Sequence, residues 1–344
     1  MNRTSLRHSR SSGLRLADEP IPALADGEAA IEVLAVGLCG TDAHILEGNF
    51  PSAEGVIIGH EVCGIVREVA GDAAIAVGDL VTVEPHRYCT ECTFCRSGDE
   101  HLCDDKKGYG VKLDGGMTTM MVSPARILYR LDPDMSPLIG AMAEPLACCI
   151  HAMDRLNPTS GTSILIAGCG PAGAMLVALS KARGLTPIVV SEPSEARREL
   201  ALAMGADLAV HPDVLGCAEV SSLVGAHGFH SVVDAVGNAA IARDLLDRVR
   251  KGGTFLVFGV AAPDDTLALT PREVYDRELT IVGSIINPYT HERAVAMLSS
   301  LPLDAIPTRV FPLTDYKAAF AAQTEGREKI YIAPNVDHLS VTLS

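Results

Sequence analysis

Four cysteine thiols lie close together in the sequence, at Cys89, Cys92, Cys95 and Cys103. A loop with this spacing offers the four thiolate ligands of a closed, tetrahedral zinc site. Two disulfides are the alternative, and zinc is favoured because the rest of the chain has the character of a cytosolic protein. A closed site has no free coordination position, so we expect this zinc to fix the loop and to do no chemistry.

A second set of metal-binding side chains is dispersed along the first half of the sequence and comprises Cys39, His60, Glu61 and Glu144. Each residue alone has an ordinary explanation, since a lone cysteine is usually part of a core and a lone glutamate usually lies on the surface. Together they offer one sulfur, one nitrogen and one or two oxygens. This mixture suits a catalytic zinc with a position kept free for water or a substrate oxygen.

A glycine-rich turn, Gly168-Cys169-Gly170-Pro171-Ala172-Gly173, follows a predicted strand and opens a predicted helix. In this GxGxxG pattern the glycines permit a tight turn, a close backbone approach to a pyrophosphate and close packing of helix on strand. The helix N-terminus then offers unpaired N–H groups to the phosphates. Such a turn is also an ordinary way to join a strand to a helix. Its context favours a dinucleotide site formed by Gly168, Gly170, Pro171, Ala172 and Gly173.

The next predicted strand ends at Glu192, close to the distance at which an acidic side chain meets the adenosine ribose hydroxyls. We predict that Glu192 binds this ribose; the alternative is a solvated carboxylate at a strand end. This assignment favours NAD, because Glu192 would repel a 2′-phosphate. Arg197 and Arg198 are near enough in sequence to leave NADP open, although we expect both on the exposed face of the following helix.

Two kinds of sequence pattern must position these groups. Up to about residue 135, short β-rich runs such as 30–36, 64–69 and 80–83 are separated by Gly, Pro and Asp, which predicts a compact, irregular β domain. From residue 163, apolar runs alternate with helical stretches such as 241–251, which predicts a parallel sheet covered by helices on both faces. The tail is expected to return to the first domain, through a helix at 291–300 and a final strand at 329–333. The predicted boundaries are 1–146 and 286–344 for the first domain and 147–285 for the sheet domain.

Composition limits the classes of function. A chain of 344 residues with 48% hydrophobic content can form two cores. The formal charge of −15 disfavours nucleic acid and membrane surfaces as partners. The chain lacks tryptophan and has only 4% aromatic residues, which favours small, hydroxylated substrates over bulky aromatic ones.

The opening residues carry Arg3, Arg7 and Arg10 but no continuous apolar stretch, so they do not form a secretory signal. They resemble an organellar presequence only faintly, and we expect a short, solvated leader strand instead. No run is long enough to span a bilayer. A cytoplasmic location is the resulting expectation.

These motifs occur in the order seen in the medium-chain zinc-dependent dehydrogenases, and the sequence resembles that superfamily over nearly its whole length. It is most similar to the polyol branch, which contains sorbitol, xylitol, arabitol and galactitol dehydrogenases. Glu144 stands where ethanol-type enzymes place a cysteine ligand, and Leu46-Glu47-Gly48 and the stretch 55–61 resemble arabitol-type members. The opening residues match the first strand of the family poorly.

The resemblance implies an α/β protein with a GroES-like catalytic domain and a Rossmann domain. It implies zinc on Cys39 and His60, with Glu61 and Glu144 as the remaining carboxylates, one of them acting through water. Thr41 would bond the alcohol oxygen and begin a proton relay. His44 is either an outer station of that relay or an ordinary loop histidine. A homodimer or homotetramer is implied as well, and an edge strand at 280–283 could pair across its twofold axis.

The expected function is NAD-linked, zinc-dependent oxidation of a polyol or secondary alcohol to a ketose or ketone by hydride transfer. A threonine-type 3-dehydrogenase of the same superfamily is one alternative, because Cys39 to His44 fits that branch equally well. A non-catalytic, zinc-stabilised nucleotide-binding protein is another. The joint presence of Cys39, Thr41, His60 and Glu144 argues against it, since a structural role would need only the four-cysteine loop.

Overall fold

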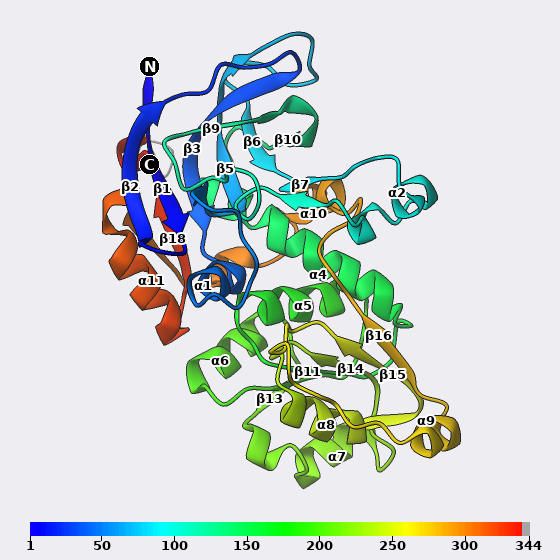
Figure 1. The fold of residues 1–344 in the computed structure, drawn as a ribbon. Helices are drawn as coiled ribbons and strands as arrows, with labels where there is room; N and C mark the ends of the chain where they lie inside the picture. Colours follow the sequence, from blue (N-terminus) through cyan, green and yellow to red (C-terminus); the bar gives the residue numbers. More distant parts are fainter. Residues whose placement is uncertain (339–344) are drawn as a thin grey trace. The chain divides into compact units, whose positions relative to one another are not determined.

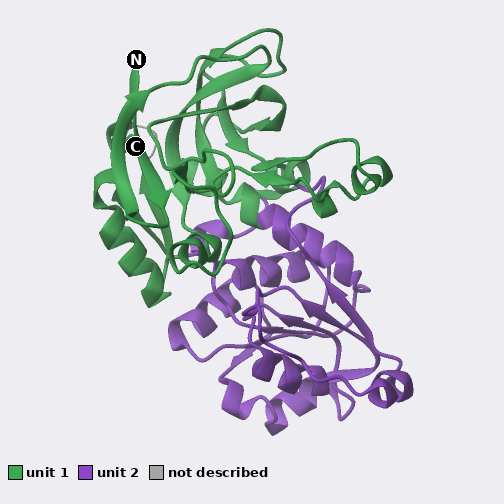
Figure 2. Ribbon diagram, in the orientation of Figure 1, with its two compact units in different colours: residues 1–145, 291–298, 307–344 green, residues 146–290, 299–306 purple. Residues whose placement is uncertain are grey.

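The computed structural model describes residues 1–338 and divides into two compact units (Figure 2). Unit 1 comprises Met1–Pro145, His291–Leu298 and residues 307–338, and unit 2 comprises Leu146–Thr290 and Ser299–Ile306. The chain thus returns to unit 1 after unit 2. Residues 286–290 and 299–306 belong to the predicted returning tail, but they group with unit 2 by their contacts.

Unit 1 is built on a seven-stranded sheet with the order β10-β6-β5-β3-β18-β17, in which β9 also pairs with β3 (Figure 1). Its strands are β3 (Glu28–Gly37), β5 (Glu61–Val69), β6 (Leu80–Val83), β9 (Met120–Pro124), β10 (Leu128–Arg130), β17 (Thr308–Pro312) and β18 (Lys329–Ala333). All pairings are antiparallel except that of β17 with β18. The central strand β3 is almost entirely buried, because it reads Ala-Ala-Ile-Glu-Val-Leu-Ala-Val and supplies apolar side chains to both faces.

The N-terminal residues form a second, three-stranded sheet of unit 1, made of β1 (Asn2–Ser9), β2 (Gly13–Pro20) and β4 (Val56–Ile57). The expected leader strand is present, but the expectation that it is solvated is wrong. Arg3 is only 4% exposed, and both Arg3 and Arg7 form ion pairs with Glu19 and Asp114. The hydrogen bond from Arg7 lowers the pKa of Glu19 to about 2, against the opposing effect of burial.

Short elements complete unit 1. A small hairpin is formed by β7 (His86–Arg87) and β8 (Lys107–Gly108). The helices are α1 (Gly40–Leu46), α2 (Thr93–Ser97), α3 (Pro137–Ala141), α10 (His291–Met297) and α11 (Tyr316–Glu325), and α4 (Ala143–Leu156) begins in unit 1 and continues into unit 2. The 3-10 helices of both units are Glu100–Leu102, Ala125–Ile127, Pro212–Val214, Leu303–Ala305 and Leu313–Asp315. Within residues 1–338, no helix combines the length and the apolar character needed to cross a membrane.

Unit 2 contains a six-stranded, wholly parallel sheet with the order β13-β12-β11-β14-β15-β16 (Figure 1). The strands are β11 (Ile164–Ala167), β12 (Ile188–Ser191), β13 (Leu208–Val210), β14 (Phe229–Asp234), β15 (Val249–Val257) and β16 (Thr280–Gly283). The helices are α5 (Pro171–Ala182), α6 (Glu195–Ala203), α7 (Ala218–Val224), α8 (Ala239–Asp247) and α9 (Pro271–Arg277). This is the strand order of a doubly wound dinucleotide-binding sheet, so the predicted fold class is confirmed.

One predicted helix in unit 2 ends too late. The sequence predicts a helix through 241–251, whereas α8 ends at Asp247 and β15 already begins at Val249. Val249 is 2% exposed and pairs with Phe229 of β14. Burial of Val249 against the core of the sheet therefore overrides the helical pattern of the preceding residues.

His291, the first residue of α10, is fully buried in unit 1. Its Nε2 lies 3.4 Å from the hydroxyl of Thr82, and its ring packs on Tyr129 with 4.8 Å between the ring centroids. Burial lowers the pKa of His291 from 6.5 to about 3. The folded chain therefore keeps this imidazole neutral at pH values at which the unfolded chain would bind a proton.

We expect this histidine to make stability depend on pH. As pH falls from 7 to 5, the unfolded state gains a proton that the folded state does not, so the free energy of unfolding should decrease by about 2 kcal/mol from His291. The test is urea unfolding at pH 7 and pH 5, which gives the change in the free energy of unfolding. It compares the wild type with His291→Gln and with the exposed control His227→Gln. His291→Gln should have a shallower pH dependence than the other two, and equal slopes for all three would contradict the assignment.

Candidate metal centres and dinucleotide site

Three of the predicted ligands come together in unit 1. Cys39 follows the end of β3, His60 immediately precedes β5, and Glu61 is the first residue of β5. The antiparallel register of β3 and β5 pairs Gly37 with Glu61 and brings the two strand ends side by side. The ligand atoms of Cys39, His60 and Glu61 all lie within 4.8 Å of one another. Cys39 is half-buried, and the other two are buried.

Asp42 holds the cysteine and faces the histidine of this group. Its side chain is fully buried; one carboxylate oxygen accepts the N–H of Cys39 at 2.9 Å, and the other lies 3.9 Å from Nδ1 of His60. Burial raises the pKa of Asp42. Burial alone would lower the pKa of His60, but Cys39, Asp42 and Glu144 outweigh it and hold that pKa well above its ordinary value. A carboxylate that orients a metal-binding histidine is a usual companion of such ligands.

Lys329, the first residue of β18, neutralises the carboxylate of Glu61. Both side chains are buried, and the ammonium forms an ion pair with Glu61 and donates to the carbonyl of Leu38 at 3.0 Å. The carboxylate lies against the bare Cα of Gly37, where an added Cβ would be 1.9 Å from Glu61 Oε2. Burial opposes the charge of Lys329, yet Glu61 raises its pKa. The pair is thus formally neutral at the edge of the metal group.

Glu144 lies near this group but outside the set of three. It is 5% exposed at the start of α4, and its charge raises the pKa of both His60 and Lys329. The described structure groups only Cys39, His60 and Glu61 within 4.8 Å. The assignment of Glu61 and Glu144 as direct or water-mediated ligands therefore stays a prediction.

The predicted proton-relay residues lie on α1. The hydroxyl of Thr41 is 3.8 Å from the sulfur of Cys39, at the edge of the metal group. His44 lies three residues later on the same helix, with 44% of its side chain exposed and Nδ1 at 3.5 Å from the carboxylate of Glu47. Residues three apart share a helix face, so the structure is compatible with a path from Thr41 to His44.

The donor set fits zinc. It provides one thiolate, one imidazole and carboxylate oxygen, as a catalytic zinc site with a free position requires. Asp42 Oδ1 and His60 Nδ1 are buried without a hydrogen-bond partner among residues 1–338. These two atoms face each other at 3.9 Å, the arrangement of a carboxylate that orients a metal-binding histidine.

The four cysteines of the other set also converge. The sulfur atoms of Cys89, Cys92, Cys95 and Cys103 lie within 4.8 Å of one another, and all four are free thiols. Cys89 accepts N–H groups of Glu91 and Cys92, and these bonds lower its pKa to about 7. Cys92 caps α2 by accepting the N–H of Cys95. Backbone donors thus favour the thiolate of Cys89, whereas burial raises the pKa of Cys95 to about 12. None of the four cysteines forms a disulfide within residues 1–338, and together they offer the four sulfur ligands of a tetrahedral zinc.

A substitution in the four-cysteine group should remove its zinc and leave the zinc of the Cys39 group in place. Cys103→Ser is expected to lower the zinc content from two ions per chain to one and to reduce the free energy of unfolding by about 3 kcal/mol or more, the stabilisation given by a ligand at a hundredfold excess over its Kd. Elemental analysis and urea unfolding measure both effects. Cys217→Ser, outside both groups, is the control. Two zinc ions in Cys103→Ser would contradict the assignment.

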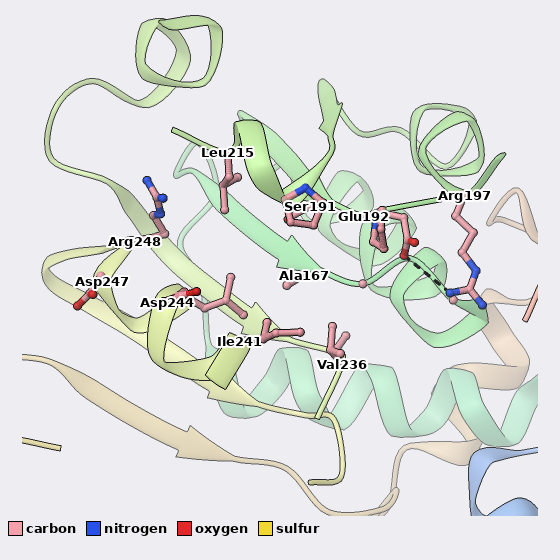
Figure 3. A pocket seen from close by; sticks show the side chains of 16 residues that line it. Ala167, Ser191, Glu192, Arg197, Leu215, Val236, Ile241, Asp244, Asp247 and Arg248 are labelled. Carbon is pink, nitrogen blue, oxygen red and sulfur yellow. Dashed lines mark ion pairs between the residues drawn. The ribbon is translucent and has the colours of Figure 1, made fainter. Parts of the chain in front are cut away.

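A cavity of about 710 Å³ lies at the carboxyl ends of the central strands of unit 2 (Figure 3). Its lining includes Ala167 and Ser191, the last residues of β11 and β12, together with Gly168 and Gly170. An added Cβ at Gly173 would lie 2.2 Å from the carbonyl oxygen of Gly168, so close packing of α5 requires this glycine. Pro171 is the first residue of α5 and leaves the N–H groups of the next residues free for an anion.

Glu192 lies in this cavity but is only 2% exposed. Its carboxylate accepts the N–H groups of Cys169 at 2.8 Å and Ser194 at 2.9 Å, so it joins the glycine turn to the end of β12. Arg197 lines the same cavity and forms an ion pair with Glu192 at 3.9 Å (Figure 3). Arg198 donates to the carbonyls of Glu192 and Pro193. The expectation that both arginines lie on an exposed helix face is therefore wrong, because the carboxylate and carbonyls of this turn attract them.

Sequence reasoning missed three residues that shape these sites: Asp42, Gln323 and Lys329. Gln323 of α11 donates to the carbonyl of Cys39 at 2.7 Å. Asp42 was within reach of a sequence argument, since it stands three residues after Cys39, in the position of a capping box at the start of α1. Gln323 and Lys329 carry no local signal.

Comparison with known proteins gives consistent matches. Residues 25–133 match the family model of the alcohol dehydrogenase GroES-like domain, and residues 171–300 match that of the zinc-binding dehydrogenases. An erythritol/L-threitol dehydrogenase of Mycolicibacterium smegmatis is 33% identical, with 93% of each chain covered. An L-threonine 3-dehydrogenase of Pyrococcus horikoshii is 34% identical, with 92% of this chain and 93% of the relative covered. A zinc-binding dehydrogenase of Sinorhizobium meliloti, solved with NADP, has a TM-score of 0.91 and 28% identity, with 97% of this chain and 100% of that chain covered.

Proposed function

The chain belongs to the zinc-binding alcohol dehydrogenases, in the branch that contains the polyol dehydrogenases, and we propose on this premise that it oxidises a small polyol at a secondary carbon. The product is a ketose, and NAD accepts the hydride. The observation that carries the proposal is the convergence of Cys39, His60 and Glu61 within 4.8 Å beside the hydroxyl of Thr41.

Zinc would be held by Cys39, His60 and Glu61, with Glu144 binding directly or through water, and would supply a Lewis acid for the alcohol oxygen. Asp42 keeps the Cys39 loop and the imidazole of His60 in place. Thr41 takes the hydroxyl proton of the substrate and passes it outward. His44, which is partly exposed, is the candidate for the next station.

The cofactor is assigned to unit 2. Gly168, Gly170, Pro171, Ala172 and Gly173 would bind the pyrophosphate at the N-terminus of α5. Glu192 would accept hydrogen bonds from the adenosine ribose, which favours NAD. Arg197 lies close enough to Glu192 to keep NADP as an alternative, and the relative from S. meliloti was solved with NADP.

A polyol is favoured over an aromatic alcohol because the chain has no tryptophan and only 4% aromatic residues. The relative from M. smegmatis acts on four-carbon polyols by its name, which supports a small substrate. Threonine is the second candidate, supported by the similarity to the enzyme of P. horikoshii. We further infer a cytoplasmic homodimer or homotetramer, joined through the edge strand β16 of each sheet.

The test is reduction of NAD and NADP across erythritol, threitol, sorbitol, xylitol, the arabitols, galactitol, threonine and simple secondary alcohols, with and without a zinc chelator. Chelator-sensitive reduction of NAD by a polyol is the expected result. Activity with threonine alone would move the assignment to the second candidate. If protein shown to contain two zinc ions per chain reduced neither NAD nor NADP with any of these substrates, a non-catalytic nucleotide-binding protein would be favoured.

A further inference from the structure

The helix α11 of unit 1 carries a polar side chain, Gln323, on its buried face. Ala319 and Ala322 of this helix are 0% and 7% exposed and belong to the core of the unit. Gln323 stands four residues after Ala319 and therefore shares its face. The Oε1 atom of Gln323 is buried and has no hydrogen-bond partner among residues 1–338. An apolar side chain would avoid this unfavourable burial, so the amide must serve a purpose other than packing.

The other end of this amide meets the loop that carries the first metal ligand. Nε2 of Gln323 donates to the carbonyl of Cys39 at 2.7 Å. The same carbonyl accepts the N–H of Asp42 at 3.1 Å, in the first turn of α1, so both of its lone pairs are used. Only the NH2 end of an amide can donate to a carbonyl, which leaves Oε1 as the atom without a partner.

Two peptide planes meet at the Cα atom of Cys39, and together they fix the direction of its side chain. The first plane is held at both polar atoms. The N–H of Cys39 donates to the carboxylate of Asp42 at 2.9 Å, and the carbonyl of Leu38 accepts Nζ of Lys329 at 3.0 Å. The second plane contains the carbonyl that Gln323 holds. Gln323 and Lys329 both come from the segment with which the chain returns to unit 1.

The second plane depends on Gln323 more than the first, because Gly40 follows Cys39. Glycine restricts the backbone least of all residues. An added Cβ at Gly40 would meet no atom of the described chain within 4 Å, so packing at this position restrains the plane little. The bond from Asp42 N–H lies within the turn and moves with it. Gln323 instead ties the turn to α11, which is anchored in the core.

We propose that Gln323 is a positioning residue of the catalytic metal centre. It fixes the second peptide plane of Cys39 and so directs the sulfur toward the ligand atoms of His60 and Glu61, which lie within 4.8 Å of it. Loss of an outer partner of a metal ligand typically lowers metal affinity or activity about 10- to 100-fold. This inference rests on the proposed function and assigns to the returning segment a part in shaping the metal centre.

The test compares the wild type with Gln323→Met, which keeps the length of the side chain but has no donor. Zinc-loaded protein is treated with a chelator and iodoacetamide, and mass spectrometry of its peptides follows the alkylation of each cysteine. Cys39 should be alkylated about tenfold faster in Gln323→Met than in the wild type, at the lower end of the range for outer partners. The four-cysteine group is the internal standard and should react at an unchanged rate.

Two further measurements separate positioning from folding. Zinc-free Gln323→Met should unfold at the same urea concentration as the zinc-free wild type or at a higher one. The variant no longer buries an unpartnered oxygen, and the carbonyl of Cys39 keeps the N–H of Asp42. With zinc and the preferred substrate, kcat should fall about tenfold with little change in KM, the pattern of a lost contribution to the transition state.

The matched control is Thr324→Ala, on the same helix. Thr324 is exposed, and its hydroxyl donates to the carbonyl of Ala321 within α11 at 2.7 Å. This variant should equal the wild type in the alkylation of Cys39 and in kcat. If Gln323→Met does not fold, Gln323→Leu repeats the comparison with another apolar side chain.

Equal rates of alkylation of Cys39 in the wild type and in the folded variant would overturn the proposal. A lower urea midpoint together with faster alkylation of the four-cysteine group would overturn it as well, because Gln323 would then support the fold as a whole. If the wild type oxidised no substrate, the proposed function would fail, whereas the alkylation rates would still decide the role of Gln323. Absence of zinc from the Cys39 group of the wild type would contradict both.

Discussion

His60→Ala should lower kcat for the preferred substrate by at least about a thousandfold, because a metal ion contributes several kcal/mol of transition-state stabilisation and this variant loses a buried ligand. The zinc content should fall from two ions per chain to one, since the four-cysteine site is separate in sequence and composition. The Kd for NADH should change by no more than about twofold, because the glycine turn and Glu192 belong to unit 2.

The matched control for this experiment is His227→Ala, which removes an exposed histidine that belongs to neither metal group. It should leave turnover and zinc content unchanged. Near-normal activity in His60→Ala with one zinc lost would show that the Cys39 group is not the catalytic centre.

Lys329→Met should lower the free energy of unfolding of the zinc-free protein by about 3 to 5 kcal/mol, because it leaves the carboxylate of Glu61 buried without its partner. Lys329 and Glu61 are 4% and 1% exposed, so solvent cannot replace the lost ion pair. The double variant Lys329→Met/Glu61→Gln should recover most of this loss, since the buried charge is removed together with its partner. Urea unfolding of the wild type, Lys329→Met, Glu61→Gln and the double variant gives the four free energies of unfolding of this double-mutant cycle.

The exposed pair of Arg272 and Asp276 on α9 provides the comparison, because surface ion pairs contribute little. Arg272→Met should be indistinguishable from wild type. When zinc is added, Lys329→Met should recover part of its stability, because a metal at the Cys39 group supplies positive charge to Glu61. If the effects of the two substitutions on the free energy of unfolding were additive in the double variant, Lys329 would have no direct role in holding Glu61.

The fold could be predicted in its main features because apolar runs that alternate with helical stretches predict a parallel sheet, which unit 2 contains. The four-cysteine group could also be predicted, since its ligands lie within one loop and local chain geometry suffices to bring them together. Cys39, His60 and Glu61 converge because β3 and β5 pair, and the motifs at the ends of both strands indicated this.

Other features depend on pairings between distant segments. Lys329 stands 291 positions after Leu38, whose carbonyl it meets, and only the register of β18 on β3 reveals it as a neighbour of Glu61. Arg3 and Arg7 were expected in solvent, because their partner Asp114 lies far along the chain. Gln323 has no motif at all; its bond to Cys39 and its unpaired oxygen appear only in three dimensions.

The most direct test of the central claim follows the hydrogen itself. Zinc-loaded protein is given NAD and a polyol that carries deuterium on every carbon, in ordinary water, and the reduced cofactor is analysed by mass spectrometry. A hydride transferred from a secondary carbon of the polyol to the nicotinamide ring predicts one deuterium in each NADH and a ketose as the product. NADH without deuterium, or no reduction of NAD by any polyol although both metal groups are filled, would contradict it.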